Sequence, residues 1–556
     1  MHIRASLSIL HTLFGIVLEL PLKRASKKSK SILAMILVIL MIAVFQRAFA
    51  QQVNLSGPVN ENDALSAAKP KCESMLAPDV IEVFDTIPNG TLSMSIDQDP
   101  QLEYRPSQSK RVLSWETGEG KSYFIPALEI LGLTLAVNAL DRLVYGDEVQ
   151  DGKKVYSTNF STFWDHLIHG PWRYDNDGFE VNQIEHAYHG SIYHGFARSA
   201  GLNFWESLGY TFLGSLLWET GGETTNPSIN DQVASGIGGS FFGESLFRMA
   251  SLLLEYRGGK PGFWQELGAA ILSPPMGFNR LVFGDRFKPV FPSRDPAIFQ
   301  WVRLGGGLIV NDTGSHITNR GQASLNYAMS YGLPGKPGYS YKRPFDYFQF
   351  EFTAFSRPNY VNIATQGLLF GEKYEVGNSY RGVWGLYGSF DYASPESFHV
   401  SSTAASLGTT AQWWLAPAVA LQGTVLSGIG IGAGGEAPKV GERDYHFGVT
   451  GRGLLALRLI FDDLAMFDMK GQGYYISRLG GSQPNGSETI SNLEAGLTFR
   501  IYGHHALGIQ YVVSRRDSRY PDLFHAHRTQ GTLSLLYTLL GDTRFGAVEW
   551  RNGNRR

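Results

Sequence analysis

The sequence predicts an α+β fold in which a periplasmic helical domain of about five helices precedes an antiparallel transmembrane β-barrel of about 12 strands. Three observations lead to this fold class: an apolar run near the N-terminus, helical periodicity over residues 120–290, and period-two alternation over residues 296–556. Charged residues make up 18% of the chain and aromatic residues 13%, whereas soluble proteins contain about 25% charged residues. An ordinary cytosolic enzyme is therefore disfavoured.

Residues 1–50 have the organisation of a secretory signal peptide. Basic residues between Lys23 and Lys30 precede the apolar run Ile32–Phe45, and Ala48-Phe49-Ala50 has the small-x-small pattern of a cleavage site. The run is 14 residues long, which is short for a membrane-spanning helix. We therefore expect export of the chain.

Charge and cysteine content exclude several classes of protein. Without residues 1–50 the chain holds 41 basic and 49 acidic residues, and no basic stripe supports binding to nucleic acid. The single cysteine, Cys72, excludes an intrachain disulfide and a multi-cysteine metal site. Residues 51–115 are polar and contain proline without sustained periodicity, so they are predicted to form a poorly ordered lead-in.

Residues 120–290 are predicted to form the helical domain. Apolar residues recur at spacings of three and four in five windows, which are residues 124–145, 182–200, 204–219, 231–256 and 263–283. Gly239 and Gly243 form a G-x-x-x-G pattern, which lets two helix backbones approach closely.

From residue 297 the apolar period changes to two. Phe348, Phe350 and Phe352, for example, alternate with Gln349 and Glu351. A membrane barrel places such apolar faces toward lipid and the polar faces toward water, whereas a soluble sandwich is the alternative. Twelve strands are predicted, near residues 297–310, 322–333, 345–356, 361–372, 380–392, 399–415, 418–432, 444–461, 465–477, 490–503, 506–516 and 528–540. We expect Phe348, Phe350, Phe352, Leu533, Leu535, Tyr537 and Leu539 to face lipid and their neighbours to face the lumen.

Histidines are concentrated in the helical domain. Five of them lie within 29 residues, and three share one broad face of a helix with 3.6 residues per turn. With the carboxylates that follow, the candidate catalytic residues are His186, His189, His194, Glu219 and Glu223, acting as general acids or bases. The segment E-H-A-Y-H lacks the H-E-x-x-H order of zinc proteases, so no metal site and no cofactor are predicted. Histidines that hydrogen-bond between packed helices are the structural alternative.

A second motif, Pro227-Ser228-Ile229-Asn230-Asp231, precedes an apolar helix. Its side chains are helix caps first of all, and the same helix start could hold an anionic head group. The candidate binding residues are Arg198, Ser228, Asn230, Asp231, Glu244 and Arg248. At least four of His186, His189, Glu219, Glu223, Asn230 and Asp231 are expected in one polar cluster.

These motifs resemble the bacterial family catalogued as domain of unknown function 3943. The resemblance rests on Asn182-Gln183-Ile184-Glu185-His186-Ala187-Tyr188-His189-Gly190, Ala197-Arg198-Ser199, Trp218-Glu219, Pro227 to Asp231, and Gly238-Gly239-x-x-x-Gly243-Glu244-x-x-x-Arg248. It implies an exported protein of Gram-negative bacteria in which this domain accompanies a barrel-like region, with no activity to transfer.

The sequence thus predicts an outer-membrane β-barrel protein of the cell envelope. A twelve-stranded lumen is too narrow for five helices, so the helical domain is expected outside it, at the periplasmic mouth, where it binds or organises an envelope component. Two alternatives stay open, an envelope lipid-modifying hydrolase or acyltransferase that uses the His/Glu cluster, and a small-solute channel. The expected partners are outer-membrane lipid and an envelope ligand.

Overall fold

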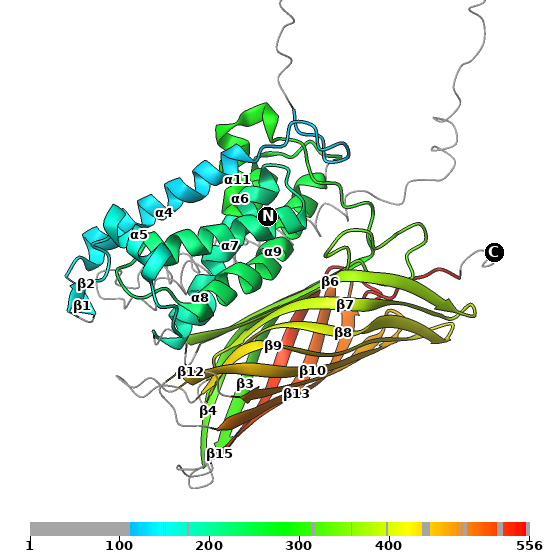
Figure 1. The fold of residues 1–556 in the computed structure, drawn as a ribbon. Helices are drawn as coiled ribbons and strands as arrows, with labels where there is room; N and C mark the ends of the chain where they lie inside the picture. Colours follow the sequence, from blue (N-terminus) through cyan, green and yellow to red (C-terminus); the bar gives the residue numbers. More distant parts are fainter. Residues whose placement is uncertain are drawn as a thin grey trace, which may run out of the picture. The chain divides into compact units, whose positions relative to one another are not determined.

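The computed structural model describes residues 112–147, 149–150, 152–174, 177–256, 258–312, 317–356, 359–395, 398–435, 445–477, 480–481, 486–519 and 526–551. The predicted signal peptide and all of the lead-in before residue 112 lie outside these residues. The described residues belong to one contact unit, in which helices precede strands along the chain (Figure 1).

The five predicted windows are helical, and the structure adds detail to them. The helices are α4 (Phe124–Tyr145), α5 (Phe160–His169), α6 (His186–Ser199), α7 (Phe204–Gly221), α8 (Ile229–Val233), α9 (Gly239–Glu255), α10 (Phe263–Leu272) and α11 (Pro274–Val282). The π-helical turns η1 (Val181–Glu185) and η2 (Ala234–Gly238) lead into α6 and α9, η3 (Gly284–Arg286) is a 3₁₀ turn, and β1 (Val149–Gln150) pairs with β2 (Lys153–Lys154).

Local sequence signals explain the helix ends that periodicity missed. The Asn159 side chain accepts a hydrogen bond from the Thr162 amide and begins α5 with a capping box. Pro274 and Pro275 divide the last predicted window, because proline suits the first turn of a helix but not its interior.

The predicted close approach of helix backbones occurs between α6 and α9. A Cβ atom on Gly239 would lie 2.6 Å from Gly190 Cα, and one on Gly243 would lie 3.0 Å from Ser191 Cα. Larger side chains would force the two helices apart, so the glycines fix the distance between them.

Twelve antiparallel strands form a closed barrel, as predicted. They are β3 (Ile298–Asp312), β4 (Ile317–Tyr331), β5 (Phe348–Ser356), β6 (Asn359–Val376), β7 (Tyr380–Ala393), β8 (His399–Ala416), β9 (Val419–Gly435), β10 (Tyr445–Phe461), β11 (Ala465–Ser477), β13 (Ser487–Tyr502), β14 (His505–Arg519) and β15 (Ala526–Leu540). Neighbours in the chain pair with each other, β15 pairs with β3, and the short β12 (Gly480–Gly481) adds to β10.

Side chains that meet across the barrel identify its inner face. Lys470 Nζ on β11 lies 2.8 Å from Glu351 Oε2 on β5, and Arg452 Nε on β10 lies 2.6 Å from Asp391 Oδ2 on β7. These strands are not neighbours in the sheet, so the four side chains point into the lumen. Residues one position away along each strand, such as Phe350, therefore face outward.

The helices pack against the outer wall of the barrel. Phe242 of α9 stacks on Phe350 and Phe390, with ring centroids 6.3 and 6.0 Å apart, and Ser245 Oγ lies 2.5 Å from Thr365 Oγ1. Phe350, Thr365 and Phe390 are register partners on one outward row. The helical domain thus lies outside the lumen, as expected, but the expected packing at the mouth is wrong, because α9 packs on the wall formed by β6 and β7 (Figure 1).

The same contacts correct part of the lipid-facing prediction. Phe348, Phe350 and Phe352 are only 0%, 6% and 3% exposed, so helices and loops rather than lipid cover them. On β15, by contrast, Leu535 is 71% exposed, and Leu533 and Tyr537 are also exposed. Period-two alternation marks an apolar outward face but does not distinguish lipid from a packed helix.

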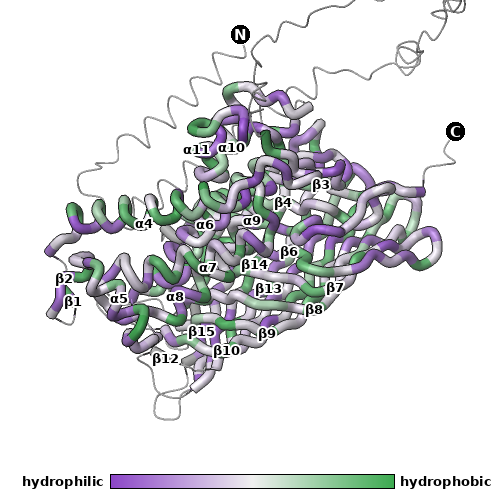
Figure 2. Tube along the Cα trace, turned by 45° about the horizontal axis from the view of Figure 1, so that its top comes forward, coloured by the Kyte–Doolittle hydropathy of each residue, from purple (hydrophilic) through white to green (hydrophobic). Residues whose placement is uncertain are grey.

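Helix α4 presents a further apolar surface. Its buried residues are Pro126, Ile130, Thr134 and Asn138, whereas Leu135 is 62% exposed and Leu143 is 85% exposed. Hydrophobic positions follow one another along α4 in Figure 2. By length and composition it is the one helix of the described residues that is able to cross a membrane.

Candidate functional site

The predicted site residues lie mainly in two buried clusters. The first, here called the His186 cluster, consists of His186, Glu219 and Asp231 with Ser228 and Asn230. One ligand-type atom from each of His186, Glu219 and Asp231 lies within 4.8 Å of the others. Four of the six residues expected in one polar cluster (His186, Glu219, Asn230 and Asp231) therefore lie together.

Three helix ends create the His186 cluster. His186 follows the π-helical turn η1 and starts α6, Glu219 lies in the last turn of α7, and Asp231 lies in the first turn of α8. The Ser228 side chain accepts a hydrogen bond from the Asp231 amide and caps α8, as its position in the motif predicts. A second π-helical turn, η2, follows α8, and such turns occur frequently at functional sites.

Hydrogen bonds orient the side chains of the His186 cluster. The Ser228 amide donates to Glu219 Oε2 at 2.8 Å, and Asn230 Nδ2 donates to Asp231 Oδ1 at 2.9 Å. His186 Nε2 lies 3.7 Å from Asp231 Oδ2, and its Nδ1 lies 3.3 Å from Ser235 Oγ. Burial, followed by the effect of His189, lowers the pKa of His186 to about 3, so its imidazole is neutral in the folded protein.

His189 and Glu223 do not join this cluster. The His189 ring packs 5.7 Å from Trp218 and 6.3 Å from Tyr193, centroid to centroid. Glu223 Oε2 accepts a hydrogen bond from Thr225 Oγ1 at 3.0 Å.

The second cluster, here called the Glu244 network, contains His194, Arg198, Glu244, Arg248 and Asp346. Glu244 accepts hydrogen bonds from Arg198 Nε at 2.7 Å and Arg248 Nε at 2.8 Å, and its Oε2 lies 3.1 Å from His194 Nε2. Burial alone would raise the pKa of the Glu244 carboxyl, but Arg198, His194 and Arg248 hold it well below its usual range. Burial lowers the pKa of His194, which Glu244 opposes.

The Glu244 network also fastens the helices to the barrel. Arg248 Nη1 donates to Asp346 Oδ1 at 3.1 Å, and Asp346 Oδ2 accepts from the backbone amides of Lys342 and Arg343 at 3.0 and 2.8 Å. These residues belong to the loop between β4 and β5. Arg198 and Arg248 thus serve as internal ion-pair partners, and both are almost fully buried.

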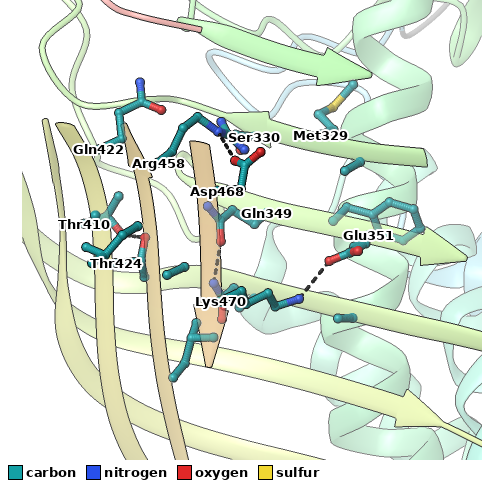
Figure 3. Close-up of a pocket in the computed structure, with 18 of the residues that line it drawn as sticks. Met329, Ser330, Gln349, Glu351, Thr410, Gln422, Thr424, Arg458, Asp468 and Lys470 are labelled. Carbon is teal, nitrogen blue, oxygen red and sulfur yellow. Dashed lines mark hydrogen bonds and ion pairs between the residues drawn. The ribbon is translucent and has the colours of Figure 1, made fainter. Parts of the chain in front are cut away.

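A third polar region lies inside the barrel. Ion pairs between Lys470 and Glu351 and between Arg458 and Asp468 line a cavity of about 120 Å³ (Figure 3). A second cavity of about 150 Å³ shares Glu351 and Lys470 in its lining. The lumen is thus polar and divided.

Sequence reasoning missed Ser235 and Asp346. Ser235 lies in a run of small residues within η2, and Asp346 lies in a loop 98 residues from its partner Arg248. Neither has a motif that would single it out. Only the fold brings them to the predicted residues.

A closed antiparallel barrel with a charged lumen and exposed apolar residues outside defines an outer-membrane type of β-barrel protein. Residues 171–275 match the family described as Domain of unknown function (DUF3943), which confirms the family predicted from the motifs.

Solved barrels are similar to part of the chain. The NanC porin matches with 11% identity and a TM-score of 0.23, over 42% of this chain and 98% of that chain. OpdO of Pseudomonas aeruginosa matches with 10% identity and a TM-score of 0.17, over 44% of this chain and 97% of that chain. The translocator domain of the autotransporter NalP from Neisseria meningitidis matches with 11% identity and a TM-score of 0.21, over 43% and 88%. A search of curated proteins found no match.

Proposed function

We propose that this protein is a non-conducting outer-membrane anchor, in which the barrel holds a helical domain that binds or organises an envelope component. The observation that carries the proposal is the lumen, which ion pairs cross from wall to wall. Lys470 pairs with Glu351 and Arg452 pairs with Asp391, each with a separation below 3 Å between charged atoms. An open channel needs hydrated inner charges, whereas these charges neutralise each other.

The C-terminal segment narrows the lumen further. Gly546 and Val548 follow β15 in the chain. Their carbonyls accept hydrogen bonds from Gln422 Nε2 at 2.8 Å and Gln412 Nε2 at 2.6 Å. Phe545 is fully buried beside inward residues of the barrel, including Trp301. Two cavities of about 120 and 150 Å³ are found in the lumen.

Loop lengths support one orientation of the barrel in the membrane. At one end of the barrel four connections are short, namely Val376 to Tyr380, Ala416 to Val419, Phe461 to Ala465 and Tyr502 to His505, whereas the other end has one short connection, Ser356 to Asn359, and longer ones such as Gly435 to Tyr445 and Ser477 to Ser487. Short turns face the periplasm in bacterial barrels, and the β4 to β5 loop lies at the same end. The contact between Arg248 and Asp346 would therefore place part of the helical domain near the periplasmic surface, with the rest along the outer wall.

Planar-bilayer recording tests this proposal against the channel alternative. The wild-type protein should show no steady conductance, whereas the double variant Glu351→Ala/Lys470→Ala should leak, because it loses both side chains of a crossing pair. Leu535→Ala, on the lipid-facing side, is the matched control and should stay silent. Steady conductance by the wild-type protein would refute the proposal.

Complementation tests the binding role of the helical domain. In cells that lack the protein, Glu351→Gln/Lys470→Gln should restore envelope integrity, whereas Glu219→Gln should not, provided that both variants assemble equally. Detergent sensitivity is the measurement. The opposite pattern would assign the function to the lumen.

The hydrolase alternative is favoured by one observation, the order Ser235, His186, Asp231. Ser235 Oγ and Asp231 Oδ2 lie on opposite nitrogens of His186, but the serine lies on Nδ1 and the carboxylate on Nε2, which is the reverse of a serine hydrolase. Moreover, Ser235 is 2% exposed and Asp231 is 3% exposed, which leaves no route for a lipid substrate. A fluorophosphonate probe should therefore not label Ser235, and labelling that Ser235→Ala abolishes would revive the enzyme hypothesis.

A further inference from the structure

The His186 cluster brings three metal-ligand side chains to one buried point. His186, Glu219 and Asp231 are 8%, 7% and 3% exposed, and their ligand atoms lie within 4.8 Å of one another. Metal bonds of about 2.0–2.2 Å place two ligand atoms up to roughly 4 Å apart. Shifts of less than about 1 Å would therefore close all three around one ion.

Hydrogen bonds behind the ligands have the form of an outer coordination shell. The Ser228 amide donates a hydrogen bond to Glu219 Oε2, and Asn230 Nδ2 donates one to Asp231 Oδ1. When His186 Nδ1–H donates to Ser235 Oγ, the lone pair on Nε2 faces Asp231 Oδ2. Such second contacts orient ligands and fix the imidazole tautomer in protein metal sites.

Electrostatics also favour a cation at this point. Glu219 lies in the last turn of α7, where the helix dipole disfavours negative charge. A second carboxylate, that of Asp231, lies within 4.8 Å, and a buried environment strengthens the repulsion between them. A divalent cation between the two carboxylates would turn this repulsion into attraction.

We propose that His186, Glu219 and Asp231 bind one divalent first-row transition-metal ion. The imidazole favours ions such as Zn²⁺ over Mg²⁺ and Ca²⁺, which prefer oxygen ligands alone. The ion would tie together the ends of α6, α7 and α8. This site departs from the sequence-based expectation of no metal, and it does not depend on whether the barrel conducts.

Zinc titration of the full-length, detergent-solubilised protein tests the proposal. The protein carries no histidine tag and is first stripped with a chelator. We expect one Zn²⁺ per chain and a higher melting temperature of the helical signal when zinc is added. Asp231→Asn and Glu219→Gln should lower the zinc affinity at least about 100-fold, and Ser235→Ala about 10- to 100-fold. His169→Ala, an exposed histidine at the end of α5, is the matched control and should bind normally.

Folding of each variant is checked by helical circular dichroism and by heat-modifiable migration of the barrel. If the ligand variants do not fold, the zinc affinity of Ser235→Ala and X-ray absorption of the zinc-loaded wild-type protein test the proposal instead. The absorption spectrum should show imidazole and carboxylate ligands. The proposal fails if the wild-type protein binds less than one zinc ion, or if folded Asp231→Asn and Ser235→Ala bind zinc as the wild-type protein does. Zinc ligands other than one imidazole and carboxylates would also overturn it.

Discussion

Substitution of Glu244 should destabilise the helical domain strongly. In Glu244→Gln, Arg198 and Arg248 stay buried but lose the carboxylate that both contact. Removal of one partner from a buried ion pair costs about 3–5 kcal/mol. Arg248 retains Asp346 at 3.1 Å, whereas Arg198 retains only the Leu202 carbonyl and nearby aromatic rings. The cost should therefore lie near the lower value, about 3 kcal/mol.

The assay is thermal unfolding in detergent, followed by helical circular dichroism, with gel migration as the check that the barrel is folded. Asp285→Asn is the control, because Asp285 pairs with Lys288 at the exposed surface, where a pair contributes at most about 1 kcal/mol. If Glu244→Gln unfolds within about 0.5 kcal/mol of this control, the network does not stabilise the domain.

The pH dependence gives a second readout of the same network. The pKa of Glu244 is depressed in the folded protein, so its contribution is fully present above the unfolded value of about 4.3. It decreases as the pH falls from there through the folded pKa. The stability difference between wild type and Glu244→Gln should thus be constant from about pH 5 to 8 and shrink below about pH 4.

Two further predictions concern helix packing and lipid contact. Gly239→Ala places a Cβ atom 2.6 Å from Gly190 Cα and should cost about 1–3 kcal/mol. Gly209→Ala, with nothing within 4 Å of the new Cβ atom, should be neutral or stabilising by about 0.5–1 kcal/mol. A thermal melt that ranks them the other way would contradict the proposed backbone contact. On α4, in a protein that also carries Cys72→Ser, lipid-soluble oxygen should relax a spin label at Leu135→Cys more strongly than one at Ile130→Cys. Stronger relaxation of the Leu135 label by an aqueous nickel complex would show that α4 faces water instead.

Strand prediction succeeded because the chain repeats one simple pattern twelve times. Period-two alternation and turn residues placed every strand end within five residues of its observed position. Residues 465–477 were predicted with the observed bounds of β11. Alternation depends only on the pleat of a strand, so it is readable without knowledge of distant contacts.

What covers the outer face of the strands could not be predicted in this way. Phe350 and Leu535 obey the same alternation, yet Phe350 lies under α9 and Leu535 is 71% exposed. The difference arises from the docking of residues more than 100 positions away in the chain. A pattern within one strand contains no information about that docking.

The sequence predicted most of the residues that belong to the candidate sites, but not how those residues divide between the His186 cluster and the Glu244 network. The H-x-x-H spacing favoured joint action of His186 and His189, whereas the two lie in different surroundings, with Asp231 near the first and Trp218 near the second. Both histidines lie in α6, so their spacing fixes only their directions on that helix, whereas Asp231 and Trp218 come from α8 and α7 and their positions depend on how the helices pack.

The ion pairs inside the barrel and the helix contacts on its outer wall bear on where a ligand binds. Lys470 pairs with Glu351 and Arg452 pairs with Asp391 across the lumen, and Phe350 and Phe390 on the outer wall stack on Phe242 of α9. These side chains are therefore engaged in contacts within the protein. The His186 cluster differs, because Glu219 and Asp231 bring two carboxylates beside a neutral imidazole. A divalent cation bound there would offset the repulsion between the two carboxylates, which is why we propose a ligand in the helical domain rather than at these surfaces of the barrel.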